Sequence, residues 1–191
     1  MKKLIVIDMD HTILDTVGLK EGLGVVLNNN PNMSATEIVK YFNDGDERIE
    51  EYIKNNVNNF LFDGVDEKLK ELNKNAKVIL LTYGLVSFQL LKTKVLPVEY
   101  FDDIILTEDD KLKVKVMREV HEKYNDYEIH FINDNWRQNE AIKKELDGKI
   151  IVKDVDNYGE KKGNNIGNIL GQIILDFHNL KKKIKEKNVK D

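Results

Sequence analysis

The sequence predicts an α/β protein in which a parallel β-sheet carries helices on both faces. Short apolar runs recur along the chain, each run ends at a polar residue, and most neighbouring runs are separated by segments with helical periodicity. Continuous apolar runs are typical of strands that are buried on both faces. Regular alternation of such strands with helices is typical of a layered parallel sheet.

Each expected element follows from this pattern. The strands are expected at residues 4–7, 78–81, 104–106, 129–132 and 150–152. The segments between the later strands have apolar residues at helical spacing and predict helices at 85–95, 111–124 and 136–146, and the tail predicts a further helix at 166–187.

One interval between strands is much longer than the others. About 70 residues separate the first two expected strands, whereas later neighbours lie roughly 20 to 26 residues apart. The extra residues read as helices, because Ser34 and Glu37 form a capping-box pattern and Ile49, Ile53, Val57 and Phe60 form an apolar stripe. We therefore expect a small all-helical cap at 16–64, inserted after the first strand of a core domain formed by 1–15 and 65–191. A long crossover with extra helices is the alternative.

The composition narrows the classes of function. The chain has 191 residues, 41% of them hydrophobic, a formal net charge of −4 and no cysteine. The absence of cysteine excludes disulfides, thiolate metal sites and a thiol nucleophile. The acidic balance predicts no nucleic-acid partner, and the lack of a long apolar run predicts no membrane partner. A cytoplasmic location is the expectation, and the oligomeric state is left open.

Polar residues at the strand ends are the candidates for function, because ligands of open α/β sheets bind at the carboxyl ends of the strands. Asp8 and Asp10 follow the first strand, Thr82 ends the second, Asp134 follows the fourth, and Lys111 opens a helix. Clustered carboxylates repel one another unless a cation lies between them. Oxygen ligands together with phosphate are typical of Mg²⁺, and Lys111 and Thr82 would then bind a phosphoryl group.

The two neighbouring aspartates suit two different tasks. A carboxylate at the end of the first strand can attack phosphorus when a metal ion screens the repulsion from an anionic substrate, so Asp8 is the expected nucleophile. Asp10 lies near it but can point elsewhere, which suits proton transfer to the leaving oxygen and from water.

These residues resemble the motifs of the haloacid dehalogenase-like hydrolase superfamily. The first motif, an apolar strand followed by DxDxT, is present at 5–15. The second is a threonine that ends a strand, at Thr82. The third is a lysine that enters a helix, at Lys111, and the fourth is an acid that closes a strand, at Asp134. The resemblance covers most of the chain. It implies a Rossmann-like core with a cap, Mg²⁺ as cofactor, Asp8 as nucleophile and metal ligand, Asp10 as general acid/base that offers its backbone carbonyl to the metal, and Asp134 as a further metal ligand.

The resemblance does not decide which residues bind the phosphate. Lys113 and Lys115 lie close to Lys111 and are alternative phosphate-binding lysines, and the backbone at Tyr83 is a further candidate phosphate ligand. Three departures from the family pattern are also present. His11 stands where glycine is common, Asn133 replaces a frequent glycine or aspartate, and Gln138 and Asn139 occupy the region of a second acid, with Glu140 one residue further.

The leading expectation is therefore a Mg²⁺-dependent phosphatase that acts on a small phosphorylated metabolite. A phosphotransferase or mutase that uses the same phospho-aspartate is the related alternative. A non-catalytic binding module on this fold is an alternative of a different class, because the second acid near Asp134 is missing.

Overall fold

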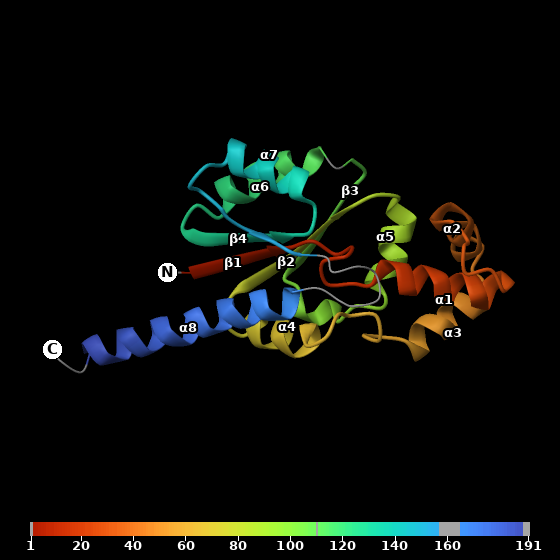
Figure 1. Ribbon diagram of the computed structural model, residues 1–191, viewed down its shortest axis with the longest axis horizontal. Helices are drawn as coiled ribbons and strands as arrows, with labels where there is room; N and C mark the ends of the chain where they lie inside the picture. The colour runs from red at the N-terminus through yellow and green to blue at the C-terminus, as the bar shows by residue number, and fades with distance from the viewer. Residues whose placement is uncertain (1, 110, 157–164, 189–191) are drawn as a thin grey trace.

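The chain folds around a five-stranded sheet with the order β3-β2-β1-β4-β5, in which every neighbouring pair is parallel (Figure 1). The computed structural model describes residues 2–109, 111–156 and 165–188. All of the expected strands are confirmed: β1 (Lys2–Ile7), β2 (Lys77–Tyr83), β3 (Asp103–Thr107), β4 (Tyr127–Asn133) and β5 (Ile151–Asp154).

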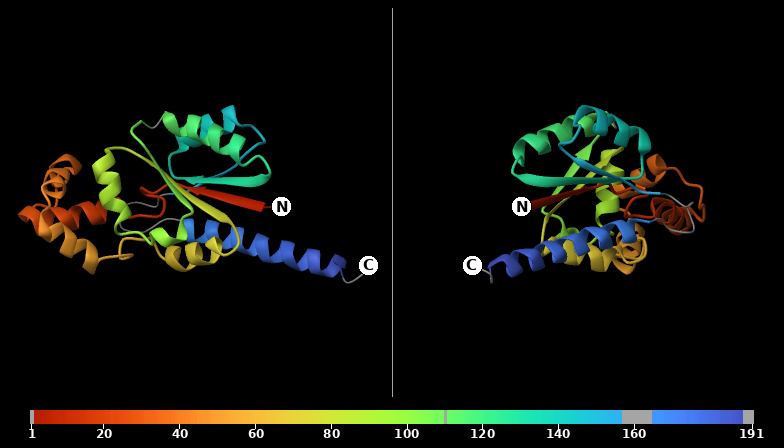
Figure 2. Two further views of the ribbon diagram at one scale, coloured as in Figure 1. Left: turned by 180° about the vertical axis from the view of Figure 1, so that it is seen from behind. Right: turned by 60° about the vertical axis from the view of Figure 1, so that its left-hand side comes forward.

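Helices cover both faces of this sheet, as the sequence predicts. Figures 1 and 2 show α6 and α7 above the sheet and α4 and α8 below it. The helices are α1 (Thr16–Asn28), α2 (Ala35–Asn43), α3 (Glu47–Asn55), α4 (Val65–Asn73), α5 (Val86–Thr93), α6 (Leu112–Lys123), α7 (Trp136–Glu145) and α8 (Ile166–Asn188), with a 3₁₀ turn η1 (Val98–Tyr100) before β3.

The central strand β1 supplies apolar side chains to both layers. Successive side chains of a strand point to opposite faces. Leu4 and Val6 accordingly pack in the apolar cluster of α6 and α7, whereas Ile5 and Ile7 pack in the cluster that contains α4, α5 and α8. A strand buried on both faces fixes its own register, because a slip by one residue would exchange the two sets of side chains.

The long interval after β1 holds four helices, and the first three of them, α1 to α3, lie beyond the carboxyl ends of the strands (Figures 1 and 2). Ser34 caps α2, and Glu37 returns the bond to the backbone of Ser34, which confirms the predicted capping box. The second half of the predicted apolar stripe is not helical, although Phe60 still packs against the apolar cluster. Helix α3 ends at Asn55, and Val57 lies in the following turn with 46% of its surface exposed.

These three helices, α1 to α3, are called the helical insert below. Leu19 and Leu23 of α1 and Ile38 of α2 belong to the same apolar cluster as Ile5 and Ile7 of β1. Because the cluster is continuous, the division of the chain into a cap at 16–64 and a core domain stays a prediction. Among the described residues, no helix combines the length and the apolar character that a membrane crossing requires.

Candidate active site

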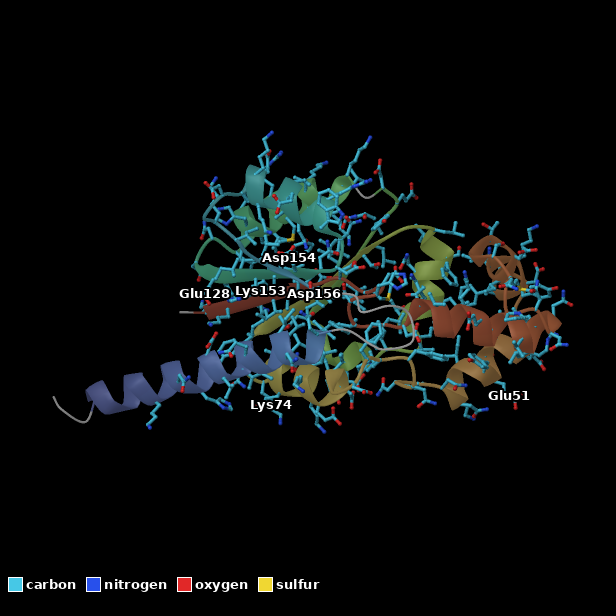
Figure 3. The ribbon with its side chains drawn as sticks, in the orientation of Figure 1. Glu51, Lys74, Glu128, Lys153, Asp154 and Asp156 are labelled. Carbon is cyan, nitrogen blue, oxygen red and sulfur yellow. The ribbon has the colours of Figure 1, made fainter. Side chains whose placement is uncertain are left out.

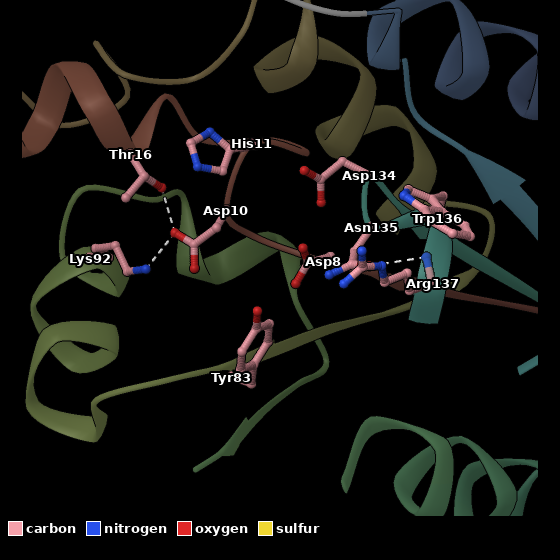
Figure 4. A pocket seen from close by; sticks show the side chains of 10 residues that line it. All are labelled: Asp8, Asp10, His11, Thr16, Tyr83, Lys92, Asp134, Asn135, Trp136 and Arg137. Atoms are coloured by element: carbon pink, nitrogen blue, oxygen red, sulfur yellow. Dashed lines mark hydrogen bonds and ion pairs between the residues drawn. The ribbon is translucent and has the colours of Figure 1, made fainter. Parts of the chain in front are cut away.

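Three neighbouring strands bring the sequence-predicted residues to one edge of the sheet. β1 lies between β2 and β4, so Asp8 after β1, Thr82 near the end of β2 and Asp134 after β4 share the carboxyl edge. A cavity of about 560 Å³ opens there (Figure 4). Its lining residues are Asp8, Asp10, His11, Thr16, Tyr83, Lys92, Asp134, Asn135, Trp136 and Arg137.

The loop after β1 is tightly folded, which fixes the direction of its side chains. The backbone N–H groups of Thr12, Ile13 and Leu14 all donate to the carbonyl oxygen of Met9. His11 adopts the left-handed conformation with φ of 56°, which is the conformation that favours glycine. The departure from glycine at this position is therefore accommodated in a strained turn, and the His11 side chain lines the cavity.

Asp8 forms an ion pair with a buried lysine at the base of the cavity. Its Oδ1 lies 2.5 Å from Nζ of Lys113, and the two side chains are 5% and 0% exposed. Burial raises the pKa of the Asp8 carboxyl to about 6, with a further contribution from the Asp10 and Asp134 carboxylates, although attraction by Lys113 opposes the change. A carboxyl group with this pKa can bind either a proton or a cation near neutral pH.

The lysine that reaches Asp8 is Lys113 and not Lys111, which the sequence favours over Lys113 and Lys115. Which of them binds phosphate stays a prediction. Helix α6 begins at Leu112, so Lys111 is its exposed N-cap residue, and its backbone N–H donates to Asp109. Lys113 lies one position inside the helix and points to the sheet. Lys115 points to solvent, where it pairs with Glu119 at 3.7 Å.

The carboxylate of Asp10 is held on the other side of the cavity. Lys92 of α5 and the hydroxyl of Thr16 both bond to its Oδ1, and the amide of Gln89 donates to its Oδ2 over 3.4 Å. Burial alone would raise the pKa of Asp10, but the charge of Lys92 and these hydrogen bonds outweigh it and hold the pKa below its usual value.

Thr82 is fully buried beneath this cluster. Its hydroxyl donates to Oε1 of Gln89 over 3.1 Å and lies 3.5 Å from Oδ2 of Asp10. Tyr83 lines the cavity, and Nζ of Lys113 lies 5.1 Å from the centre of its ring. Both residues are thus at the site, and Thr82 contacts the Asp10 side of it.

Asp134 lies on the opposite wall. Its backbone N–H donates to the hydroxyl of Thr12 over 3.2 Å, and that hydroxyl lies 3.5 Å from Oδ1 of Asp134. Burial raises the pKa of Asp134, and the charges of His11 and Lys113 work against this rise. The contact with Thr12 ties the loop after β4 to the loop after β1, which explains the position of threonine in the first motif.

Three amide side chains at the end of β4 and in α7 stabilise the strand end and are not among the residues that line the cavity: Asn133, Gln138 and Asn139. The amide of Asn133 donates to Gln138 and Asn139, and Asn139 donates to Asp154 over 2.7 Å. Asp154, at the end of β5 (Figure 3), also accepts from Lys143. Glu140 is exposed and pairs with Lys143, so it supplies no acid to the site.

The side chains of the three aspartates predicted to bind the metal, Asp8, Asp10 and Asp134, do not form one metal-binding group. Within residues 2–109, 111–156 and 165–188, no group of three acidic or histidine side chains is arranged to hold a metal ion. The bonds from Lys92 and Thr16 explain this, because they hold the Asp10 carboxylate on one side of the cavity. The carboxylates of Asp8 and Asp134, which line the cavity, have the oxygen donors that could hold Mg²⁺.

Sequence reasoning missed Lys92 and Gln89. Both are polar residues in the half-apolar helix α5, three positions apart and so on one face, where both are buried. That spacing was the available signal, because two polar side chains on the apolar face of a helix need partners in the interior.

No protein-family model matches the sequence, and no curated protein matches it. Several solved structures, by contrast, are similar to this chain in fold. A protein described as a haloacid dehalogenase-like hydrolase from Burkholderia xenovorans is 16% identical, covers 79% of this chain and 82% of its own, and has a TM-score of 0.57. A β-phosphoglucomutase from Clostridium difficile is also 16% identical, covers 99% of this chain and 100% of its own, and has a TM-score of 0.51. An enzyme of the same family from Bacteroides thetaiotaomicron, whose structure holds magnesium and inorganic phosphate, is 13% identical over 85% and 98% of the two chains, with a TM-score of 0.48.

The sheet order and the strand-end residues define a class of protein, the parallel α/β proteins with an acidic pocket at the carboxyl edge of the sheet. Within that class, the first two likenesses show that this chain has the haloacid dehalogenase-like fold. The fold expected from the motifs is therefore confirmed.

Proposed function

We propose that the protein is a Mg²⁺-dependent phosphatase that hydrolyses a small phosphorylated metabolite through a phospho-aspartate at Asp8. The observation that carries this proposal is the pairing of buried Asp8 with Lys113, in a cavity that also holds Asp10 and Asp134. A nucleophile, a cation for the phosphoryl group, a proton-transfer group and a metal ligand are thus available within one pocket.

In this proposal Asp8, Asp134 and the Asp10 backbone carbonyl hold Mg²⁺. When bound, the ion supplies positive charge that screens the repulsion between the Asp8 carboxylate and the phosphoryl oxygens. Lys113 takes the place of Lys111 as the phosphate-binding lysine, and Thr82 and Tyr83 remain the proposed phosphate ligands at the end of β2.

The first step transfers the phosphoryl group to the enzyme. An oxygen of the Asp8 carboxylate attacks phosphorus, the bond between phosphorus and the ester oxygen breaks, and the leaving oxygen takes a proton from the Asp10 carboxyl. The pKa of Asp10 is low in the free protein. An anionic phosphate close to Asp10 disfavours its charged form, and the substrate therefore promotes the protonation that this step needs.

The second step releases the product. Water attacks the phosphorus of phospho-Asp8, Asp10 takes a proton from this water, and inorganic phosphate departs as the Asp8 carboxylate is restored. The low pKa of Asp10 suits this step, because its carboxylate is the form that accepts the proton.

The helical insert is proposed to act as the cap of this site. Thr16, the first residue of α1, lines the cavity and bonds to Asp10, so the insert begins at the active site itself. A helical layer beyond the strand ends limits access by large substrates and favours small ones.

Phosphate release from a panel of phosphorylated metabolites and p-nitrophenyl phosphate, with Mg²⁺ or with a chelator, tests the proposal. We expect Mg²⁺-dependent release that is abolished in Asp8→Asn and lowered by about 100-fold or more in Lys113→Met. Lys111→Met is the matched control and should retain wild-type activity, because Lys111 is exposed outside the cavity. Equal release by wild type and Asp8→Asn contradicts the proposal.

Two alternatives have distinct outcomes in the same assay. The first alternative is a phosphotransferase or mutase, which is supported by the likeness to a β-phosphoglucomutase. Such an enzyme would transfer the phosphoryl group to a sugar phosphate acceptor faster than to water. A non-catalytic module would bind Mg²⁺ weakly and release no phosphate while remaining folded.

A further inference from the structure

Helix α5 carries two buried polar side chains on the face that meets the active site. Gln89 is 3% exposed and Lys92 is 1% exposed, although the helix packs in the apolar cluster through Phe88 and Leu91. Lysine is almost never buried without a partner, because removing its charge from water is unfavourable. Both side chains therefore need polar partners in the interior.

Both of them bind Asp10. Nζ of Lys92 pairs with Oδ1, and Nε2 of Gln89 lies 3.4 Å from Oδ2 while it also donates to the carbonyl oxygen of Tyr83 over 2.6 Å. Figure 4 shows Lys92 pointing at Asp10 from the side away from Asp8. One helix thus holds both oxygens of the Asp10 carboxylate, and Gln89 fixes that helix to the end of β2.

The two active-site aspartates therefore have separate lysines. Lys113 reaches Asp8 from α6, which packs on one face of the sheet through Met117. Lys92 reaches Asp10 from α5, which packs on the other face. The two ammonium groups attract the two carboxylates from opposite sides of the sheet and so separate two like charges that lie only two residues apart.

We propose that Lys92, supported by Gln89, is a positioning residue that holds the Asp10 carboxylate apart from Asp8 and oriented for proton transfer with the leaving oxygen. The inference rests on the proposed function. Without Lys92, Asp10 is free to turn toward Lys113 or toward the cation held by Asp8 and Asp134, where it cannot serve the leaving oxygen. Lys92 acts only through Asp10 and needs no contact with the substrate.

The test compares Lys92→Met and Lys92→Arg in the full chain with p-nitrophenyl phosphate and Mg²⁺. Methionine keeps an unbranched chain of similar length in the apolar surroundings, and the Asp10 side chain is 24% exposed, so water can replace the lost bond. We expect Lys92→Met to lower kcat by about ten- to a hundredfold with KM changed less than about threefold. Lys92→Arg keeps the charge and should recover part of that loss.

A double-mutant cycle shows whether the effect passes through Asp10. If Lys92 only positions Asp10, adding Lys92→Met to Asp10→Asn lowers kcat no further. Lys113→Met is the comparison variant, because it acts on Asp8 and should lower the activity of Asp10→Asn again. Lys94→Met is the matched control, because Lys94 is exposed directly after α5 and should leave activity unchanged.

Two results overturn the inference: wild-type kcat in Lys92→Met, or a loss that adds in full to that of Asp10→Asn. If Lys92→Met does not fold, Lys92→Gln replaces it, with an expected loss of severalfold or more in kcat that also disappears in the Asp10→Asn background. Retained activity in Asp8→Asn would instead contradict the proposed function, so the two failures are distinguishable.

Discussion

At the scale of single residues, the protonation state of Asp8 would link proton binding to the proposed binding of Mg²⁺. Burial raises the pKa of its carboxyl to about 6, so the group is largely protonated below that pH and ionised above it. In the proposed mechanism Mg²⁺ would bind the ionised form, and its affinity should therefore fall as the pH decreases through about 6. At a pH near 6 we expect binding to release about half a proton from Asp8.

Calorimetric titration of Mg²⁺ in two buffers with different enthalpies of ionisation measures this proton release directly. At a pH of about 8 the Asp8 carboxyl is already ionised and its proton release should vanish, which provides the internal control. Equal Mg²⁺ affinity on both sides of pH 6 without proton release would show that Asp8 is not a ligand of the ion.

Single residues also show where sequence reasoning succeeds and where it stops. Asp8, Thr82 and Asp134 could be predicted because each ends an apolar strand, and the end of a parallel strand has a fixed place in the fold. The lysine could not be chosen in the same way. Which of Lys111, Lys113 and Lys115 faces Asp8 depends on where α6 begins, and helix boundaries shift by one or two residues.

At the scale of elements, the helical insert was predicted as helical, but its internal packing was not. The stripe at Ile49 and Ile53 continues in the sequence to Val57 and Phe60, although the helix ends between them at Asn55. Asn58 then takes a left-handed conformation, with φ of 66°, which redirects the chain toward α4. Apolar spacing alone does not report such a break, because turn residues can also pack against the cluster.

Replacing a helical glycine by alanine is expected to change the free energy of unfolding in opposite directions at two positions, Gly24 and Gly171. A Cβ at Gly24 of α1 would lie 2.1 Å from the carbonyl oxygen of Asn30, whereas at Gly171 of α8 the nearest atom is the flexible Lys68 Cε at 3.4 Å. We expect Gly24→Ala to destabilise the protein by about 1–3 kcal/mol, because backbone must move. Gly171→Ala should stabilise it by up to about 1 kcal/mol through helix propensity.

Urea unfolding followed by circular dichroism measures both changes in the free energy of unfolding. Each variant serves as the control for the other, since both replace a glycine within a helix by alanine. Equal effects in the two variants would mean that the turn after α1 yields to the added methyl group and does not fix the geometry of the insert.

At the scale of the whole molecule, one apolar cluster joins the helical insert to the sheet. Ile5 and Ile7 of β1, Leu23 of α1 and Ile38 of α2 all belong to it, together with side chains of α4 and α8. Elements that share one apolar core lose their buried contacts together when the core opens. Unfolding of these elements is therefore expected to be cooperative. We predict that the insert and the sheet unfold in one transition, in spite of the sequence pattern that suggests two domains.

The single tryptophan of the chain makes this prediction measurable. Trp136 begins α7 and reports on the sheet, and a Trp136→Phe chain with Phe42→Trp reports on α2 of the insert. In each protein the fluorescence and circular dichroism transitions in urea should coincide. An earlier fluorescence transition confined to the α2 reporter would show that the insert unfolds alone. The proposed cap would then be a separate domain, and its contact with Asp10 through Thr16 would break before the site itself unfolds.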